Sequence, residues 1–233
     1  MTTRGSEKAP GGESGARSTT SRRPDRLSRD RIVDAATAIL DEDADGSGGL
    51  TLRALTTRLS TGAGAIYHHV STMDDLRAAA ADHVLERGLR GLRADDPDAA
   101  IEAAALAIHE VMETHRWFAG QLGRDPVQPA AIRIWKTIGA ELRRLDGGAV
   151  DPARGGSVLF RFILGSAVQH ADGPGRLRSP ADERDARERA AARVRDTDAD
   201  SLTTGIAASI SEHDDRDQFR DGVRTILRGL RVT

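Results

Sequence analysis

The chain of 233 residues contains no cysteine, and no run of apolar residues in it is long enough for a transmembrane helix. The absence of cysteine excludes disulfide bonds and thiolate metal ligands, which suits a reducing compartment. A helix that spans a bilayer needs roughly 20 apolar residues, and no segment approaches that length. The N-terminal residues also lack the apolar segment of a secretory signal. We therefore expect a cytoplasmic protein that does not bind membranes.

Asparagine is absent as well, and aromatic residues make up only 3% of the chain. Hydrophobic residues account for 38% and charged residues for 30%, which is typical of a soluble globular protein. The length allows one large domain or two modest ones. The formal net charge of -2 at pH 7 neither favours nor excludes a nucleic-acid ligand, so the local distribution of charge must decide.

The segment 51–70, TLRALTTRLSTGAGAIYHHV, has the pattern of two short helices around a tight turn. The first helix, which Thr51 can cap, has an apolar stripe at spacings of three and four residues, formed by Leu52, Leu55 and Leu59. The run 60–64 contains two glycines and supplies the turn. Ile66 and Val70 are four residues apart and face inward. This arrangement leaves three polar side chains exposed, those of Tyr67, His68 and His69.

The charge of this segment suits contact with phosphate. From Gly46 to Met73 there is no acidic residue, whereas Arg53, Arg58 and two histidines are present. A surface without carboxylates does not repel a polyanion. The segment therefore has the shape and the charge of a helix-turn-helix that reads DNA, and the alternative is a pair of amphipathic helices in an ordinary bundle.

The flanking segments carry matching helix signals. Ser28 is placed to cap a helix whose apolar stripe consists of Ile32, Ala35, Ala36, Ile39 and Leu40. Downstream, the run 71–74 matches the Ser/Thr-x-x-Asp/Glu start signal, with Asp74 and Asp75 at the positive end of the next helix. We expect that helix to span residues 73–92.

The order helix, helix, turn, helix and long helix, with IYHHVSTMDDL across the last junction, resembles the TetR family of transcriptional regulators. The resemblance covers residues 27–89. It implies an all-α protein with a three-helix DNA-binding domain at residues 27–72 and a domain at residues 73–233 that binds a small effector and dimerises. Two positions depart from the family pattern, because Ser60 replaces a glycine of the turn and Met73 replaces a lysine that contacts phosphate.

The chemistry of the segment narrows how DNA is recognised. Asparagine is absent and all four glutamines lie elsewhere, so bidentate amide recognition of adenine is excluded. Arg53 can pair with guanine, while Ala63 and Ala65 can touch thymine methyl groups. Gly64 permits close approach of the backbone, although glycine weakens a helix by roughly 1 kcal/mol. With the positions that the resemblance adds, the DNA-binding candidates are Thr51, Arg53, Ala63, Gly64, Ala65, Tyr67, His68, His69 and Thr72.

Residues 1–26 are rich in glycine, serine, threonine, proline and arginine, without apolar periodicity. Such a composition predicts a disordered basic arm. The arm can lie along phosphates or reach a minor groove, as other N-terminal arms do. A solvated tail without a role is the equally weighted alternative.

The remainder of the chain is a series of helical patterns separated by proline and glycine. We expect helices at residues 99–115, 117–122, 129–145, 153–171 and 215–230, and a solvated or partly disordered charged segment at 181–200. In the segment SVLFRFILGSAV, Val158, Phe162 and Gly165 share one line, and Leu159 and Ile163 lie on the adjacent one. So broad an apolar face with small residues predicts a homodimer interface shared with the last helix, and two core helices of a monomer are the alternative.

The effector candidates are the aromatic and neighbouring polar residues of these helices. A mostly apolar pocket with few polar groups suits a hydrophobic effector. Through the family resemblance, its walls are assigned to His109, Met112, Trp117, Phe118, Trp135, Phe162, Gln169 and His170. Each of them taken singly is equally consistent with an ordinary core residue.

An enzyme is the competing class, and the sequence carries no complete motif for one. His109 and His115 are six residues apart, so they cannot bind one metal ion from a single regular helix. The chain contains no P-loop and no nucleophile elbow, and GAGAIY lacks the third glycine of a dinucleotide motif. We therefore expect a non-enzymatic regulator without cofactor or metal, whose partners are operator DNA and a small molecule. A helical adaptor that has lost DNA binding is the other alternative.

Overall fold

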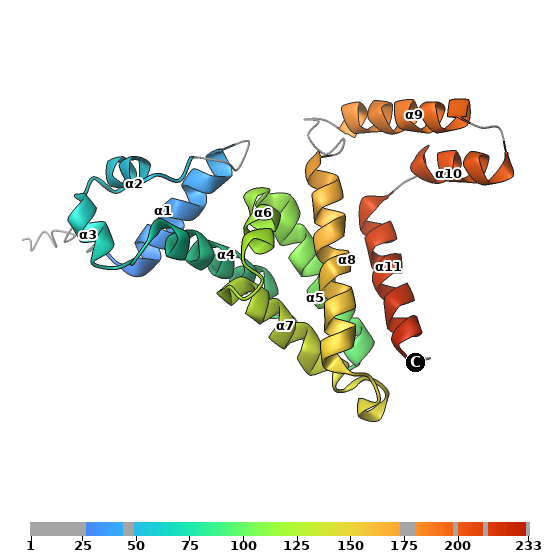
Figure 1. The fold of residues 1–233 in the computed structure, drawn as a ribbon, viewed down its shortest axis with the longest axis horizontal. Helices are drawn as coiled ribbons and strands as arrows, with labels where there is room; N and C mark the ends of the chain where they lie inside the picture. Colours follow the sequence, from blue (N-terminus) through green and yellow to red (C-terminus); the bar gives the residue numbers. More distant parts are fainter. Residues whose placement is uncertain (1–26, 44–48, 173–179, 198–199, 212–213, 232–233) are drawn as a thin grey trace, which may run out of the picture.

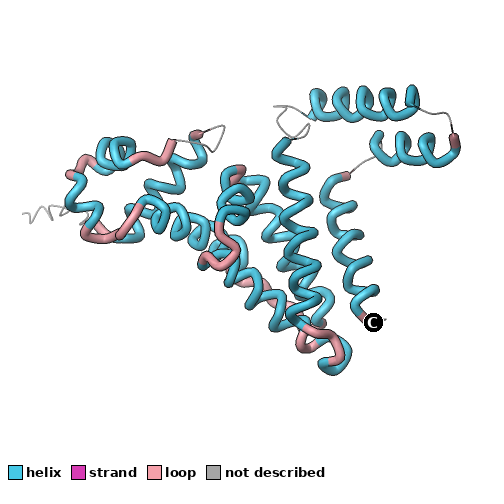
Figure 2. Tube along the Cα trace, viewed as in Figure 1, coloured by secondary structure: helices cyan, strands magenta, loops and turns pink. Residues whose placement is uncertain are grey.

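The computed structural model describes residues 27–43, 49–172, 180–197, 200–211 and 214–231. Within these ranges every regular element is a helix, in agreement with the predicted all-α class (Figures 1 and 2). The N-terminal arm that the sequence predicts lies outside the described residues. In the described part of the chain no helix has both the length and the apolarity to cross a membrane.

Three helices form an N-terminal unit that we call the head: α1 (Arg29–Glu42), α2 (Leu52–Leu59) and α3 (Ala63–Tyr67). Figure 1 shows the head at one end of the molecule. The hydroxyl of Ser28 accepts a hydrogen bond from the amide of Arg31 at 3.3 Å, and that of Thr51 accepts one from Ala54 at 3.1 Å. Both caps were predicted from the sequence.

Helix α4 (Met73–Leu89) connects the head to the rest of the molecule. Its cap is Thr72, whose hydroxyl accepts from the amide of Asp75 at 3.0 Å, so the predicted start signal at 71–74 is shifted by one residue. The predicted end at residue 92 is also wrong. Arg90 leaves the helical conformation and Gly91 has a φ of 82°, a left-handed value that ends the helix at Leu89.

The larger part of the molecule is a helical bundle. It contains α5 (Pro97–Thr114), α6 (Trp117–Arg124), α7 (Pro129–Leu142), a short 3₁₀ helix (Leu145–Gly148), α8 (Pro152–Asp172) and α11 (Asp215–Leu230). Helix α1 packs along α4, and one apolar core runs from α1 and α2 into the bundle. The core therefore continues across the predicted domain boundary at residue 72.

The predicted charged segment is a helix, α9 (Pro180–Thr197), and it is followed by α10 (Ser201–Ser211). The two helices pack on each other, and Ala191 on α9 and Ala207 on α10 are fully buried. Figure 1 shows this hairpin beyond the ends of α8 and α11. The guanidinium of Arg187 lies 3.2 Å from Asp215 at the start of α11.

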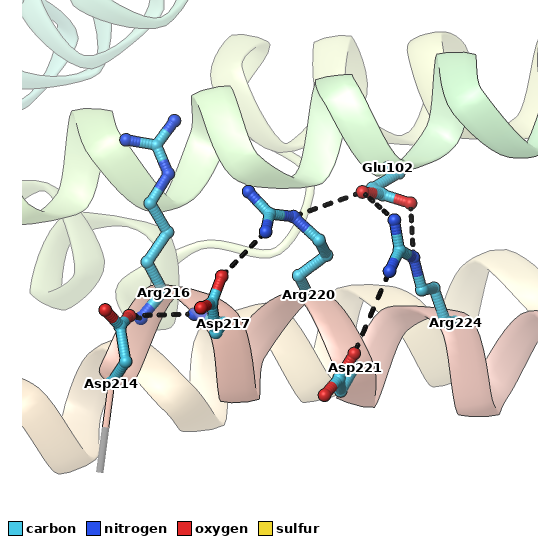
Figure 3. Close-up of polar contacts among 7 residues, drawn as sticks. All are labelled: Glu102, Asp214, Arg216, Asp217, Arg220, Asp221 and Arg224. Carbon is cyan, nitrogen blue, oxygen red and sulfur yellow. Dashed lines mark hydrogen bonds and ion pairs between the residues drawn. The ribbon is translucent and has the colours of Figure 1, made fainter. Parts of the chain in front are cut away.

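Helix α11 is held against α5 by ion pairs to Glu102, and Arg231 just beyond its end binds Asp98 of α5. Glu102 on α5 lies 3.2 Å from the Nε of Arg220 and 2.9 Å from the Nε of Arg224 (Figure 3). The hydrogen bond to Glu102 raises the pKa of Arg224. On the adjacent face, α11 buries Phe219, Val223 and Leu227. The last helix is thus fixed by an apolar stripe and a charged pair of arginines.

Candidate nucleic-acid interface

Helices α2 and α3 are joined by a turn whose geometry is set by Ser60. Its φ of 50° and ψ of 47° are left-handed, a conformation that favours glycine. The amide of Ser60 donates to the carbonyl of Thr57, and that of Thr61 donates to Thr56 across 3.1 Å, which completes the end of α2. Serine therefore occupies the backbone geometry for which the family pattern has glycine.

Helix α3 is short and is anchored by two apolar side chains. Ile66 is fully buried and Val70 is 6% exposed, as the spacing predicted. On the opposite side the exposed positions are Ala63, Gly64, Ala65, Tyr67 and His68, with His69 partly buried. A Cβ added at Gly64 would have no neighbour within 4 Å. The outward face is therefore uncharged unless a histidine is protonated, and its backbone is accessible.

The two arginines of α2 have different environments. The exposed side chain of Arg53 has no ion pair with any residue of the described ranges, so its five N–H donors are available to a ligand. Arg58 instead donates to both carboxylate oxygens of Glu42, at 2.8 and 2.6 Å. This contact lowers the pKa of Glu42. The stretch without acidic residues thus receives the carboxylate of Glu42 from α1, which Arg58 neutralises, and that of Asp43, which accepts from the amide of Gly49.

Thr51 and Thr72 are both caps, and their hydroxyl oxygens already accept a backbone amide. Each is exposed, so its hydroxyl proton can still be donated. Met73 packs partly buried against the apolar core, where the family pattern has a lysine. Sequence reasoning missed Arg77, whose guanidinium donates to the carbonyl of Leu50 at 2.9 Å and braces the loop before α2.

The predicted effector residues lie in three separate groups. His109 is 2% exposed and its ring lies 4.4 Å from that of Phe219, which also stacks on Phe162 at 5.3 Å. Trp135 stacks on Phe160 at 5.8 Å. Sequence reasoning did not identify Phe160 or Phe219 as effector candidates.

The third group lies on α6 and at the end of α5. Trp117, Phe118 and Met112 are all buried, and the rings of Trp117 and Phe118 are 6.3 Å apart. The indole N–H of Trp117 donates to Asp41 in the head at 2.7 Å. The side chains of Gln169 and His170 lie outside the described residues. Within the described residues no cluster of histidine and carboxylate side chains is arranged to hold a metal ion.

Comparisons with known proteins give the chain its family. No family model matches it. An HTH-type transcriptional regulator of Saccharopolyspora erythraea is 30% identical over 194 residues, which are 78% of this chain and 80% of the relative. A solved TetR regulator from Streptomyces coelicolor is 35% identical, with a TM-score of 0.71 over 88% of this chain and 97% of that one. The chain belongs to the TetR family of transcriptional regulators.

A second solved structure is the TetR family protein ActR of Streptomyces coelicolor in complex with (S)-DNPA. It is 25% identical, with a TM-score of 0.65 over 88% of this chain and 97% of ActR. The head of this TetR regulator is therefore a helix-turn-helix DNA-binding domain, and the bundle is its C-terminal domain. The family predicted from residues 27–89 is confirmed by likenesses that cover most of the chain.

Proposed function

We propose that this TetR regulator is a homodimeric repressor that binds a palindromic operator and leaves it when a small hydrophobic effector binds. The observation that carries the proposal is the outward face of α3, which is exposed and carries no carboxylate, beside Arg53, which has no ion-pair partner among the described residues. In this arrangement Arg53 pairs with guanine. Ala63 and Ala65 contact thymine methyl groups, and Gly64 lets the backbone approach.

The remaining candidates hold the sugar–phosphate backbone. Tyr67 is 48% exposed, so its hydroxyl group can reach a phosphate. His68, His69, Thr51 and Thr72 lie on the same helix-turn-helix and can donate hydrogen bonds to phosphate oxygens. Contacts of this kind fix the position of the head, whereas Arg53 and the alanines supply the sequence preference.

Dimerisation is supported by the exposed side of α8. Arg154, Val158, Arg161 and Gly165 follow one another at spacings of four, three and four residues, and all are exposed. Val158 is 42% exposed, and Gly165 has no neighbour within 4 Å of an added Cβ. Such a line with a glycine allows a second helix to approach closely. Two heads about one helical turn of DNA apart would then read the two halves of a palindrome.

An effector site is supported by the aromatic groups of the C-terminal domain. His109, Phe162 and Phe219 bring α5, α8 and α11 together, and Trp135 adds a stack between α7 and α8. A similar protein, ActR, has been solved with (S)-DNPA bound. An effector releases DNA when it binds better to the conformation whose head spacing does not fit the operator.

The DNA arm of the proposal is tested by selection from random duplex DNA with the purified protein and with Arg53→Ala and Tyr67→Ala. Arg184→Ala, an exposed arginine of α9, is the matched control. We expect the wild type and the control to enrich one palindrome, and the two head variants to lose that enrichment. If the wild type shows only salt-sensitive background binding, the chain is a helical adaptor instead.

The dimer arm uses the absence of cysteine, because a single introduced cysteine can form a disulfide only between copies. We expect Val158→Cys or Gly165→Cys to give a cross-linked dimer under mild oxidation. Val127→Cys, at a position that is 71% exposed beside α6, should remain monomeric on a denaturing gel. A monomer in sedimentation equilibrium of the wild type would contradict the dimer.

A further inference from the structure

The C-terminal end of α1 carries three consecutive carboxylates, Asp41, Glu42 and Asp43, and its last turn has no basic residue. Acidic groups are unfavourable at this end of a helix, where the macrodipole is negative. Each of the three has a partner from another segment. Glu42 binds Arg58 and Asp43 accepts from the amide of Gly49 at 2.7 Å, both within the head. Asp41 is the one that reaches the C-terminal domain.

Asp41 binds two residues at the junction of α5 and α6 through one oxygen. Its Oδ1 accepts from the indole N–H of Trp117 at 2.7 Å. The same oxygen lies 2.7 Å from Nδ1 of His115. Trp117 is 7% exposed, so its N–H would lose a hydrogen bond without this carboxylate. The rings of His115 and Trp117 are 6.0 Å apart, edge to face.

A second bridge lies two turns earlier on the same face of α1. Asp34 precedes Asp41 by seven residues, and its Oδ1 lies 3.1 Å from Nε2 of His83 on α4. Between the two bridges the helices are not in full contact, because a cleft of about 570 Å³ opens among α1, α4 and α5. The far end of α1 is therefore tied to the C-terminal domain by polar contacts.

We propose that Asp41 determines which half-site spacing the dimer accepts, by fixing the angle of the head against α6. The inference rests on the proposed dimeric DNA binding and deepens it. Trp117 begins α6 and is followed by the fully buried Phe118, so a shift of α6 moves the donor that holds Asp41. With the contact intact, the head follows the C-terminal domain as one body. Without it, the head turns about the α1–α4 contact.

The test measures affinity for the selected operator and for copies with one or two base pairs inserted or removed between the half-sites. Each base pair changes the separation by about 3.4 Å and the direction by roughly 35°. The variants are Asp41→Ala, Asp41→Asn and Trp117→Phe, with Asp82→Ala as the control. Asp82 on α4 binds Arg133 on α7 at 2.7 Å, so this variant loses an aspartate ion pair that does not touch the head.

We expect the wild type and Asp82→Ala to lose about tenfold or more in affinity when the spacing changes by two base pairs. Asp41→Ala and Trp117→Phe should bind the selected spacing within about threefold of wild type and lose most of this discrimination. Asp41→Asn keeps an oxygen that accepts from both partners and should retain the wild-type discrimination between spacings. The agreement of Trp117→Phe with Asp41→Ala separates the contact from a loss of folding.

Two results would overturn the role of Asp41 in half-site spacing while leaving the proposed DNA binding intact. One is a wild-type spacing profile for both Asp41→Ala and Trp117→Phe, and the other is equal loosening by Asp82→Ala. If the wild type selects no operator at all, the proposed function fails and this inference fails with it. The selection with the wild type therefore distinguishes a failure of the proposed function from a failure of the Asp41 inference.

Discussion

The ring of Phe162 on α8 lies against Gly222 on α11, so that a Cβ at position 222 would be 2.3 Å from the Cζ atom. Phe162 also stacks on Phe219 and cannot retreat freely. Gly222→Ala should therefore lower the free energy of unfolding by about 1–3 kcal/mol, the usual cost of overpacking. Urea denaturation measures this loss. The matched control is Gly229→Ala on the same helix, where nothing lies within 4 Å of the added atom. A loss of equal size in both variants would show that the contact with Phe162 is not its cause.

Ser60 should be a site of stored strain. A non-glycine residue in the left-handed region, such as Ser60, costs roughly 1–2 kcal/mol. Glycine removes this cost but loses part of the gain, because it gives up more conformational entropy on folding. We expect Ser60→Gly to raise the free energy of unfolding by about 0.5–1 kcal/mol. Ser60→Ala keeps the Cβ and serves as the control. Thermal unfolding of the two variants would contradict the prediction if alanine stabilised as much as glycine.

Gly64 should separate stability from DNA binding. Its Cβ position is open, and alanine strengthens a helix by roughly 1 kcal/mol relative to glycine. Gly64→Ala should thus leave the fold intact or slightly more stable, while its methyl group blocks the close approach of DNA. Fluorescence anisotropy with the selected operator should show weaker binding by about tenfold, which equals about 1.4 kcal/mol. Equal or tighter binding would place the DNA away from Gly64.

The contact of Glu42 with Arg58 predicts a sign for the pH dependence of stability. The hydrogen bond from Arg58 lowers the pKa of Glu42 in the folded protein. This contribution is therefore present above the ordinary pKa of the carboxyl group and is lost as pH falls through the lowered value. The difference in urea midpoint between wild type and Glu42→Gln should be small because the pair is exposed, and it should vanish at acidic pH. Glu188→Gln, on the exposed part of α9, should show no such trend.

The helix-turn-helix could be predicted from the sequence because its signals are local. Caps such as Thr51 and the burial of Ile66 follow from spacing within a few residues. The predicted start of α4 at Met73 is confirmed, but its capping residue was off by one because two overlapping pairs, Ser71 with Asp74 and Thr72 with Asp75, match the same signal. Only the backbone geometry distinguishes between them.

Elements and contacts that depend on distant residues could not be predicted. Helix α10 is rich in serine, threonine and small residues, and it packs on α9, with Ala207 and Ala191 both fully buried. The bond between Asp41 and Trp117 joins residues 76 positions apart. The sequence placed Trp117 among the effector candidates because it is aromatic and lies on a helix that the family resemblance assigns to the pocket. No local pattern indicated that its indole faces the head.

Trp117 and Trp135 are the two tryptophans of the chain, and they occupy different environments. Trp117 is bonded to the DNA-binding domain, whereas Trp135 stacks on Phe160 within the C-terminal domain. Replacing Trp135 by phenylalanine would leave one tryptophan, at the junction of head and bundle. The C-terminal domain thus carries one tryptophan at its contact with the head and one in its interior, so movement of the head and occupancy of the bundle can be followed separately without an attached dye.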